Sequence, residues 1–159
     1  MITFKKVKLC FLLIFVLVNI LYIAPCYSLS SREDLFKNAL DLSSGGKFNL
    51  ALQEWDRYLD SYPDDAAGLS NRGNVRLVLG DIEGSIDDQN NAINLNPSEI
   101  DPYINRGIAE EALGLWSQAK KDYMFVISQD SQNFSALYNL ANVEGSTSQW
   151  EKARDLFSK

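Results

Sequence analysis

The sequence predicts an all-α fold, a right-handed superhelical solenoid of antiparallel helix pairs. The first observation behind this prediction is a period of 34 residues, which relates four tracts that begin at Arg32, Ala66, Ile100 and Phe134. The second is helical spacing of the apolar residues in each half of a tract, and the third is glycine or proline between the halves and the tracts. A fixed period of this length is typical of a solenoid, in which each unit buries its apolar face only against its neighbours.

Two columns of the aligned tracts hold only small residues. The eighth column contains Ala39, Gly73, Gly107 and Ala141, and the twentieth contains Ala51, Ser85, Ala119 and Ala153. Antiparallel helices approach closely where side chains are small, so these columns predict the contact within each pair. Large residues nearby, such as Trp55, Tyr123, Trp116 and Phe157, then fill the space between adjacent pairs.

Each tract is expected to form a helix, a short turn and a second helix. In the second tract Gly80 suits a helix C-terminus and Asp81 suits the start of the next helix, which Asn96-Pro97 ends. The first tract diverges in its opening helix, where an irregular structure is expected. Gln89 stands where the other tracts carry an aromatic residue, so the second unit is expected to be the least tightly packed.

The N-terminus has the pattern of a secretory signal peptide. Lys5, Lys6 and Lys8 precede an apolar stretch from Leu9 to Ala24, which a small residue, Ser28, follows. We expect residues 1–28 to be a leader cleaved near Ser28. The alternatives are an uncleaved membrane anchor over residues 4–24, although this stretch is shorter than the about 20 residues of a spanning helix, and a lipoprotein signal at Cys26, which Pro25 disfavours.

Composition excludes several classes of function for the remaining chain. Without the three leader lysines, 12 basic residues stand against 21 acidic ones, a net charge of −9. This balance disfavours nucleic acid and anionic membrane surfaces as partners. Both cysteines lie in the leader and the sequence contains no histidine. We therefore expect no disulfide, no metal site and no cofactor.

The repeated columns resemble those of the tetratricopeptide repeat. The resemblance covers Arg32 to Lys159, with tracts such as "NRGNVRLVLGDIEGSIDDQNNAINLNP" and "INRGIAEEALGLWSQAKKDY". It implies units over 32–65, 66–99, 100–133 and an incomplete fourth over 134–159. It also implies a concave face that binds segments of other proteins.

The groove residues follow from the columns that line this face in the family. They mix amide, apolar and acidic side chains, and asparagine pairs suit an extended peptide backbone. The predicted groove consists of Ser70, Asn74, Leu77, Asp101, Ile104, Ile108, Glu111, Tyr138 and Asn142. The alternative is that the asparagines only follow the repeat's own consensus.

Basic residues are absent from these groove columns. Some family members hold a C-terminal carboxylate there with lysines and an arginine, so we expect no clamp of that kind. Arg72 and Arg106 share the seventh column, and Asp88 and Asp122 share the twenty-third. We predict the pairs Arg72–Asp88 and Arg106–Asp122 across their hairpins, as structural contacts without a ligand.

Catalytic motifs are not found in the sequence. The adjacent carboxylates Asp64-Asp65, Asp87-Asp88 and Glu110-Glu111 do not face each other on a helix and are expected to lie on solvated faces. No phosphate loop, nucleophile–base pair or metal spacing occurs. The sequence therefore predicts a protein that is not an enzyme and has no small-molecule substrate.

The predicted function is a protein-interaction scaffold that binds a peptide or a partner subunit in its groove. The tracts "NRGNVRLVLGDIEGSI" and "NLANVEGSTSQWEKA" also resemble exported repeat proteins of cyanobacteria and chloroplasts. That resemblance implies a thylakoid lumen or periplasm, and help in assembling a photosynthetic membrane complex. The alternatives are a general scaffold for envelope assembly and the regulatory domain of a longer enzyme.

The fourth tract stops at Lys159, before its second helix would be complete. We expect either a fragment of a longer protein or an exposed end that docks another copy or a partner.

Overall fold

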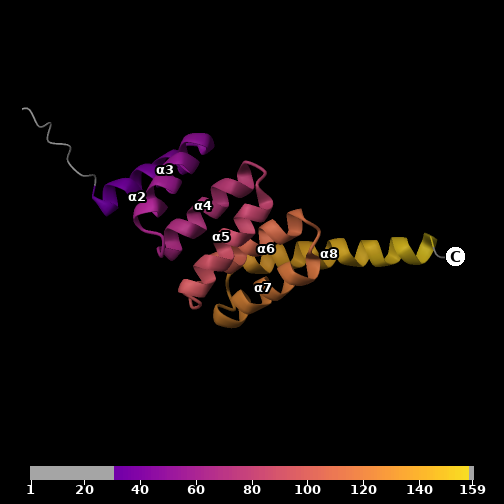
Figure 1. Cartoon of the computed structure of the whole chain (residues 1–159). Coiled ribbons are helices and arrows are strands. Elements are labelled where there is room, and N and C mark those ends of the chain that lie inside the picture. The colour runs from indigo at the N-terminus through magenta and orange to yellow at the C-terminus, as the bar shows by residue number, and fades with distance from the viewer. Residues whose placement is uncertain (1–30, 158–159) are drawn as a thin grey trace, which may run out of the picture. The chain divides into compact units, whose positions relative to one another are not determined.

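The computed structural model describes residues 31–157, with side chains up to Ser148. This part of the chain forms helices and no strand, which confirms the predicted all-α class. Residues Asp34–Lys159 make one compact unit, in which helices follow one another as antiparallel neighbours (Figure 1). The helices are α2 (Arg32–Ser44), α3 (Phe48–Ser61), α4 (Ala66–Val78), α5 (Ile82–Leu95), α6 (Asp101–Ala112), α7 (Trp116–Gln129) and α8 (Phe134–Phe157).

The turn within each of the first three tracts depends on a glycine with left-handed backbone. Gly46, Gly80 and Gly114 have φ angles of 71°, 88° and 72°, a region that side chains with a Cβ rarely adopt. After the second of these turns, the Asp81 carboxylate accepts a hydrogen bond from the backbone N–H of Gly84 at 3.0 Å and caps α5. The predicted roles of Gly80 and Asp81 are confirmed.

The fourth tract differs from the others because it forms one continuous helix. The prediction of a turn in this tract is wrong. Helix α8 runs without interruption from Phe134 to Phe157 and extends beyond the helix pairs (Figure 1). The column that holds the left-handed glycine in the other tracts contains Ser148 here. Serine adopts that backbone conformation at a cost of roughly 1–2 kcal/mol, so the helix continues instead.

Two further expectations about packing are wrong. The opening helix of the first tract is regular, since α2 is helical from Arg32 to Ser44. The second unit is not loosened at Gln89, whose side chain is fully buried and occupies the place of the aromatic residue. Hydrogen bonds from the Gln89 Nε2 atom compensate for the burial of its amide group, although its Oε1 atom has no partner.

The small residues of the eighth and twentieth columns bring the paired helices together as predicted. Ala51, Ser85 and Ala119 are completely buried, and a Cβ placed on Gly73 would lie only 3.2 Å from the Ser85 carbonyl oxygen. Trp55 and Tyr123 are also completely buried and fill the space beside them. Close backbone contact at the small columns therefore sets the spacing within each pair.

The first helices of successive tracts form the inner layer of the solenoid. α4 contacts α6, and α6 contacts α8, whereas α5 and α7 do not contact each other within the described residues. The layer of first helices is therefore the more closely spaced one and forms the concave side.

Apolar side chains form two core clusters, one around Trp55 and Tyr58 and one around Tyr123 and Val126. The buried side chains of α5 that belong to neither cluster are polar, namely Ser85, Asp88 and Gln89. Within the described range, no helix combines the length and apolarity needed to cross a bilayer. The predicted leader, residues 1–28, lies outside that range.

Candidate functional site: an amide-rich groove between first helices

A pocket of about 310 Å³ opens on the layer of first helices, between the N-terminal halves of α4 and α6. The loop before α6 closes one end of it. Asparagine is the most frequent residue in its wall, which consists of Ala66, Ala67, Ser70, Asn71, Asn74, Asn96, Glu99, Asp101, Pro102 and Asn105. The pocket therefore offers amide donors and acceptors on both sides of a narrow space.

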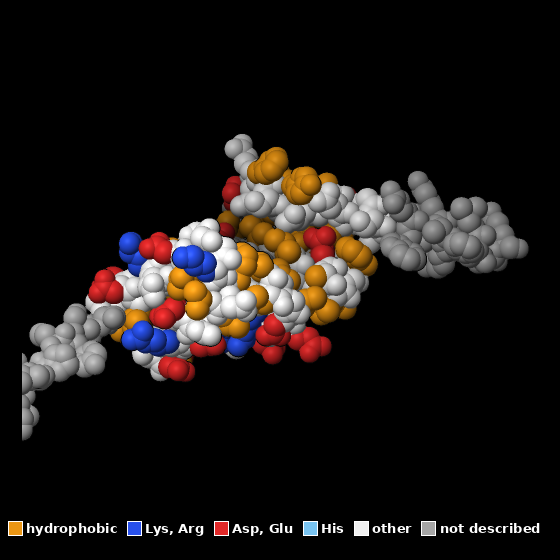
Figure 2. Space-filling model, turned by 90° about the horizontal axis from the view of Figure 1, so that it is seen from above, with side chains coloured by type: hydrophobic (Ala, Val, Ile, Leu, Met, Phe, Trp, Pro, Cys, Tyr) orange, Lys and Arg blue, Asp and Glu red, His pale blue; other side chains and the backbone are white. Residues whose placement is uncertain are grey.

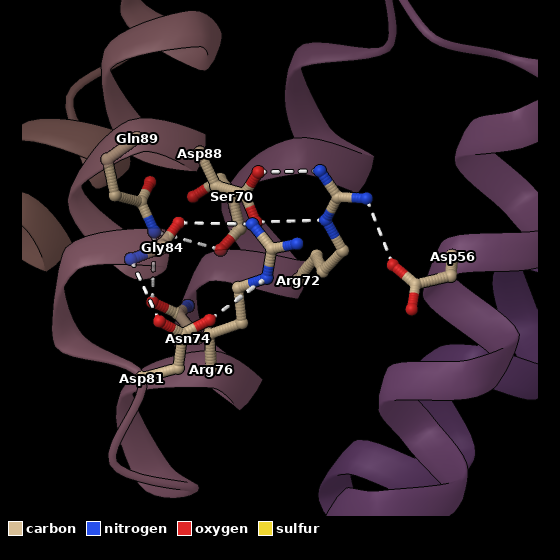
Figure 3. A network of polar contacts seen from close by, with 9 residues as sticks. All are labelled: Asp56, Ser70, Arg72, Asn74, Arg76, Asp81, Gly84, Asp88 and Gln89. Carbon is tan, nitrogen blue, oxygen red and sulfur yellow. Dashed lines mark hydrogen bonds and ion pairs between the residues drawn. The ribbon is translucent and has the colours of Figure 1, made fainter.

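Hydrogen bonds across the pocket floor fix the orientation of these amides. Asn105 Nδ2 donates to Ser70 Oγ at 3.1 Å and connects α6 to α4. From below, Gln89 Nε2 donates to the Ser70 carbonyl oxygen at 2.9 Å and to Asn74 Oδ1 at 3.3 Å (Figure 3). The buried glutamine thus holds Asn74 in place, so the binding surface is organised before any ligand arrives.

The charge of this pocket is acidic. Glu99 and Asp101 lie in its wall, and no lysine or arginine does. On the face seen in Figure 2, the basic side chains gather near the N-terminal end, and only acidic, apolar and uncharged ones are visible toward α8. A cationic or neutral segment therefore fits this pocket better than an anionic one.

The structure brings three of the nine predicted groove residues into the pocket, namely Ser70, Asn74 and Asp101. Ile108, Tyr138 and Asn142 are exposed farther along the inner layer, and Leu77 is half-buried. Ile104 is buried and belongs to the core cluster around Tyr123. Glu111 accepts a hydrogen bond from the Tyr123 hydroxyl group at 2.5 Å, so it also supports the packing. Whether the nine residues bind a ligand stays a prediction.

Asn71, Asn96, Glu99 and Asn105 belong to the same pocket but were not among the predicted groove residues. Asn71 and Asn105 share the sixth column, so their repetition was a visible signal. Asn96 and Glu99 lie between two helices, and only the fold places them beside α4.

An arginine network forms the rigid support of the second unit (Figure 3). Arg72 donates to Asp88 through two nitrogens, at 2.9 and 2.7 Å, and to Asp56 on the preceding helix pair at 3.0 Å. Arg76 pairs with the same Asp88 at 2.9 Å. The Asp88 hydrogen bonds raise the pKa of Arg72, the expected effect of a carboxylate on a guanidinium group.

The third unit repeats this arrangement. Arg106 contacts Asp122 through two nitrogens, both at 2.7 Å, and Asn90 on the preceding pair at 2.7 Å. Both predicted arginine–aspartate pairs are therefore confirmed. The contacts to Asp56 and Asn90 were not predicted, although these residues share the twenty-fifth column. Each arginine thus joins its own helix pair to the one before it.

Two acidic residues were wrongly expected on solvated faces. Asp88 is buried within the arginine network, and Glu110 is buried on α6 with one carboxylate oxygen lacking a partner. Burial and the nearby Asp122 raise the pKa of Glu110 to about 7, against the opposing effects of Arg106 and Lys121. Burial, followed by the hydrogen bond to Glu111, raises the pKa of Tyr123.

Metal-ligating side chains do not gather in the described residues, where no group of three or more His, Cys, Asp or Glu could hold an ion. The chemistry available in the pocket is hydrogen bonding and charge recognition.

The chain is similar to repeat proteins of known fold. Residues 36–100 match the family model of the tetratricopeptide repeat. The first TPR domain of human RPAP3 is 26% identical, with a TM-score of 0.72 over 76% of this chain and 95% of that one. The first TPR of Spaghetti (RPAP3), solved bound to the HSP90 peptide SRMEEVD, is 26% identical, with a TM-score of 0.70 over 74% of this chain and 93% of that one.

Two similar curated proteins are much longer than this chain. Human tetratricopeptide repeat protein 6 is 28% identical over 87% of this chain and 26% of its own length. RNA polymerase II-associated protein 3 of Xenopus laevis is 33% identical over 62% of this chain and 15% of its own length. The chain spans about a quarter or less of these relatives. Together with the solved structures, they confirm a helical solenoid of the tetratricopeptide type.

Proposed function

Because the fold is a helical solenoid of the tetratricopeptide type, we propose that the chain is a non-catalytic scaffold that binds an extended segment of a partner protein along its inner layer. Similar domains bind peptides: the Spaghetti (RPAP3) structure holds SRMEEVD. To bind a peptide in the same way, the inner layer of this chain needs a groove with polar groups that form hydrogen bonds to a peptide backbone.

The observation that carries the proposal is the pocket of about 310 Å³ between α4 and α6. Asn71 and Asn74 line it from α4, and Asn105 lines it from α6. An asparagine side chain donates and accepts at once, as a peptide group does, so facing asparagines can hold successive peptide groups of one extended strand. Gln89 holds Asn74, and Ser70 holds Asn105, which limits the conformational freedom that these amides lose on binding.

The ligand of this groove is neutral or basic rather than acidic. The wall carries Glu99 and Asp101 and no cation, and Arg72 and Arg106 are engaged with aspartates. A peptide such as SRMEEVD would bring its carboxylates against the same charge. We therefore expect no clamp for acidic C-terminal tails in this groove.

The proposed cellular setting rests on the sequence alone. A leader over residues 1–28 or an anchor over residues 4–24 would place the groove in the thylakoid lumen or the periplasm, where it would assist assembly of a photosynthetic membrane complex. A general envelope scaffold and a regulatory domain of a longer enzyme are the alternatives, and the reading frame after Lys159 distinguishes them.

A selection from a random peptide library tests the proposal without knowledge of the partner. Wild-type protein, the double variant Asn74→Ala Asn105→Ala and the control Asn49→Ala are panned in parallel. Asn49 is an exposed asparagine on α3 and is not among the residues that line the pocket. We expect wild type and control to enrich the same peptides, poor in Asp and Glu, and the double variant to lose them. Equal enrichment on the double variant would refute binding at this groove.

A further inference from the structure

One column of the repeat alternates between apolar and amide side chains along the inner layer. The ninth column holds Leu40 on α2, Asn74 on α4, Ile108 on α6 and Asn142 on α8. Leu40 is 41% exposed and Ile108 is 40% exposed, and neither belongs to the two core clusters of the described residues. A single exposed aliphatic side chain is ordinary. Two in the same column, one on each side of an amide, form a regular pattern that a ligand can read.

The amide pocket lies in the middle of this row. Asn74 lines the pocket, α4 contacts α6, and α6 contacts α8. Helix α2 precedes α4 by the same repeat of 34 residues. Packed helices have axes roughly 8–10 Å apart, so one column recurs along the inner layer at about that interval. A segment that crosses the first helices therefore meets an apolar, an amide and an apolar position at equal steps.

The polyproline II conformation presents side chains to one side at this interval. It has three residues per turn, so every third side chain faces the same way, about 9.3 Å apart. In a β-strand every second side chain faces the same way, roughly 6.6 Å apart, and the third points to the opposite side. An α-helix satisfies its backbone groups internally and would leave Asn71, Asn74 and Asn105 without peptide partners. A polyproline II backbone has no internal hydrogen bonds and keeps these groups free.

We propose that the partner segment binds in the polyproline II conformation, with apolar side chains on Leu40 and Ile108 and a polar residue between them at the amide pocket. The three positions are about three residues apart, so the two apolar residues are about six apart. This inference rests on the proposed function, because the amide pocket fixes the register of the segment. Proline in the intervals holds the conformation in advance and reduces the entropy lost on binding. The partner is therefore a proline-containing segment with regularly spaced apolar residues.

The random-library selection proposed for the groove reveals this spacing. We expect the peptides that wild type enriches, and that Asn74→Ala Asn105→Ala loses, to share two apolar residues about six apart, with proline enriched between them. Apolar residues that recur at every second position would indicate a strand, and a spacing of seven would indicate a helix. Either result would overturn the polyproline II conformation while the scaffold function stood. Equal enrichment on the double variant would refute binding at the groove, and this inference with it.

Variants of the ninth column test which side chains the apolar residues contact. Ile108→Asn gives the third unit the side chain that the second unit carries in this column. Alanine at one apolar position of the best selected peptide should weaken binding to wild type about fivefold or more. The same peptide change should weaken binding to Ile108→Asn by less than about twofold, because the contact is already lost. The other apolar position should behave in the same way with Leu40→Asn.

A control variant and a change of spacing complete the test. Met124 is 53% exposed on α7, a second helix, so Met124→Asn should bind the peptide like wild type. One alanine inserted between the two apolar residues of the peptide should weaken binding at least about tenfold, because it rotates one of them away from its contact. Fluorescence anisotropy measures the affinities, and circular dichroism confirms that the variants fold. Unchanged affinity after the insertion would overturn the proposal, and so would alanine effects that are equal on wild type and on both asparagine variants.

Discussion

At the scale of single residues, the two arginines of the seventh column, Arg72 and Arg106, each connect their own helix pair to the preceding one. Arg106 occupies two nitrogens with Asp122 and a third with Asn90, and Arg72 does the same with Asp88 and Asp56. The carboxylates of Asp88 and Asp122 are nearly buried, so each depends on its arginine for compensation of its charge. The two sites differ in two respects. Asp88 also pairs with Arg76, and Arg72 contacts the carboxylate of Asp56 where Arg106 contacts the amide of Asn90.

The additional pairing of Asp88 with Arg76 predicts unequal costs for the two arginines. Arg106→Met should lower the free energy of unfolding by about 3 kcal/mol, since among the described residues Arg106 is the only cation paired with Asp122. Arg72→Met should cost less, because Arg76 remains beside Asp88. The double variant Arg106→Met Asp122→Leu should recover most of the loss. Urea denaturation measures all three, and a double variant no more stable than Arg106→Met would contradict the burial of Asp122.

Glu110 predicts a dependence of stability on pH. Its pKa is raised to about 7 in the folded protein, above the usual carboxylate value of 4.5, by burial and by Asp122. The folded state therefore holds this proton more tightly, and the contribution to stability present below pH 4.5 is lost as pH rises to about 7. Glu110→Gln should match wild type near pH 4.5 and exceed it by roughly 1–3 kcal/mol at pH 8. A difference that does not change between the two pH values would show that Glu110 is not desolvated.

At the scale of helices, the turn glycines determine where each helix ends. Gly114 has left-handed backbone, whereas Gly145 is exposed within α8 with no atom near the position of a Cβ. Gly114→Ala should therefore destabilise the protein by about 1–2 kcal/mol. Gly145→Ala should stabilise it by about 0.5–1 kcal/mol, because alanine favours a continuous helix. Thermal unfolding compares the two, and a gain from Gly114→Ala would refute the left-handed turn.

The contact between paired helices makes a second prediction at this scale. Ala119 is completely buried in the column of small residues on α7, the helix that pairs with α6. Ala119→Leu should overpack this contact and cost about 1–3 kcal/mol. Ala112→Leu, at an exposed position of α6, is the matched control and should have little effect. An unchanged melting midpoint in Ala119→Leu would show that the helices are paired in another register.

At the scale of the whole molecule, the period of 34 residues predicted the class of fold and the two arginine–aspartate pairs, because a repeat turns local columns into spatial neighbours. It did not predict the continuous α8, although Ser148 in a glycine column was a visible signal. It also missed the contacts to Asp56 and Asn90, which join different units. Burial of Ile104 and Glu110 could not be predicted because it depends on which neighbours a helix face meets after packing.

The candidate site was predicted in part for the same reason. Ser70 and Asn74 follow from the columns of α4, and Asp101 from those of α6. Asn96 and Glu99 enter the pocket through the loop between units, whose path is set by the packing of α5 on α6 rather than by the repeat. The sequence therefore predicts which helices line the groove better than it predicts where along them a pocket forms.

The central claim is that the amides between α4 and α6 hold an extended segment. The most direct measurement is the dissociation constant of the best library-selected peptide, titrated by fluorescence anisotropy into wild type, Asn49→Ala and Asn74→Ala Asn105→Ala. We predict unchanged affinity for Asn49→Ala and at least about tenfold weaker binding to the double variant, equivalent to about 1.4 kcal/mol. Affinity for the double variant within twofold of wild type would contradict the claim.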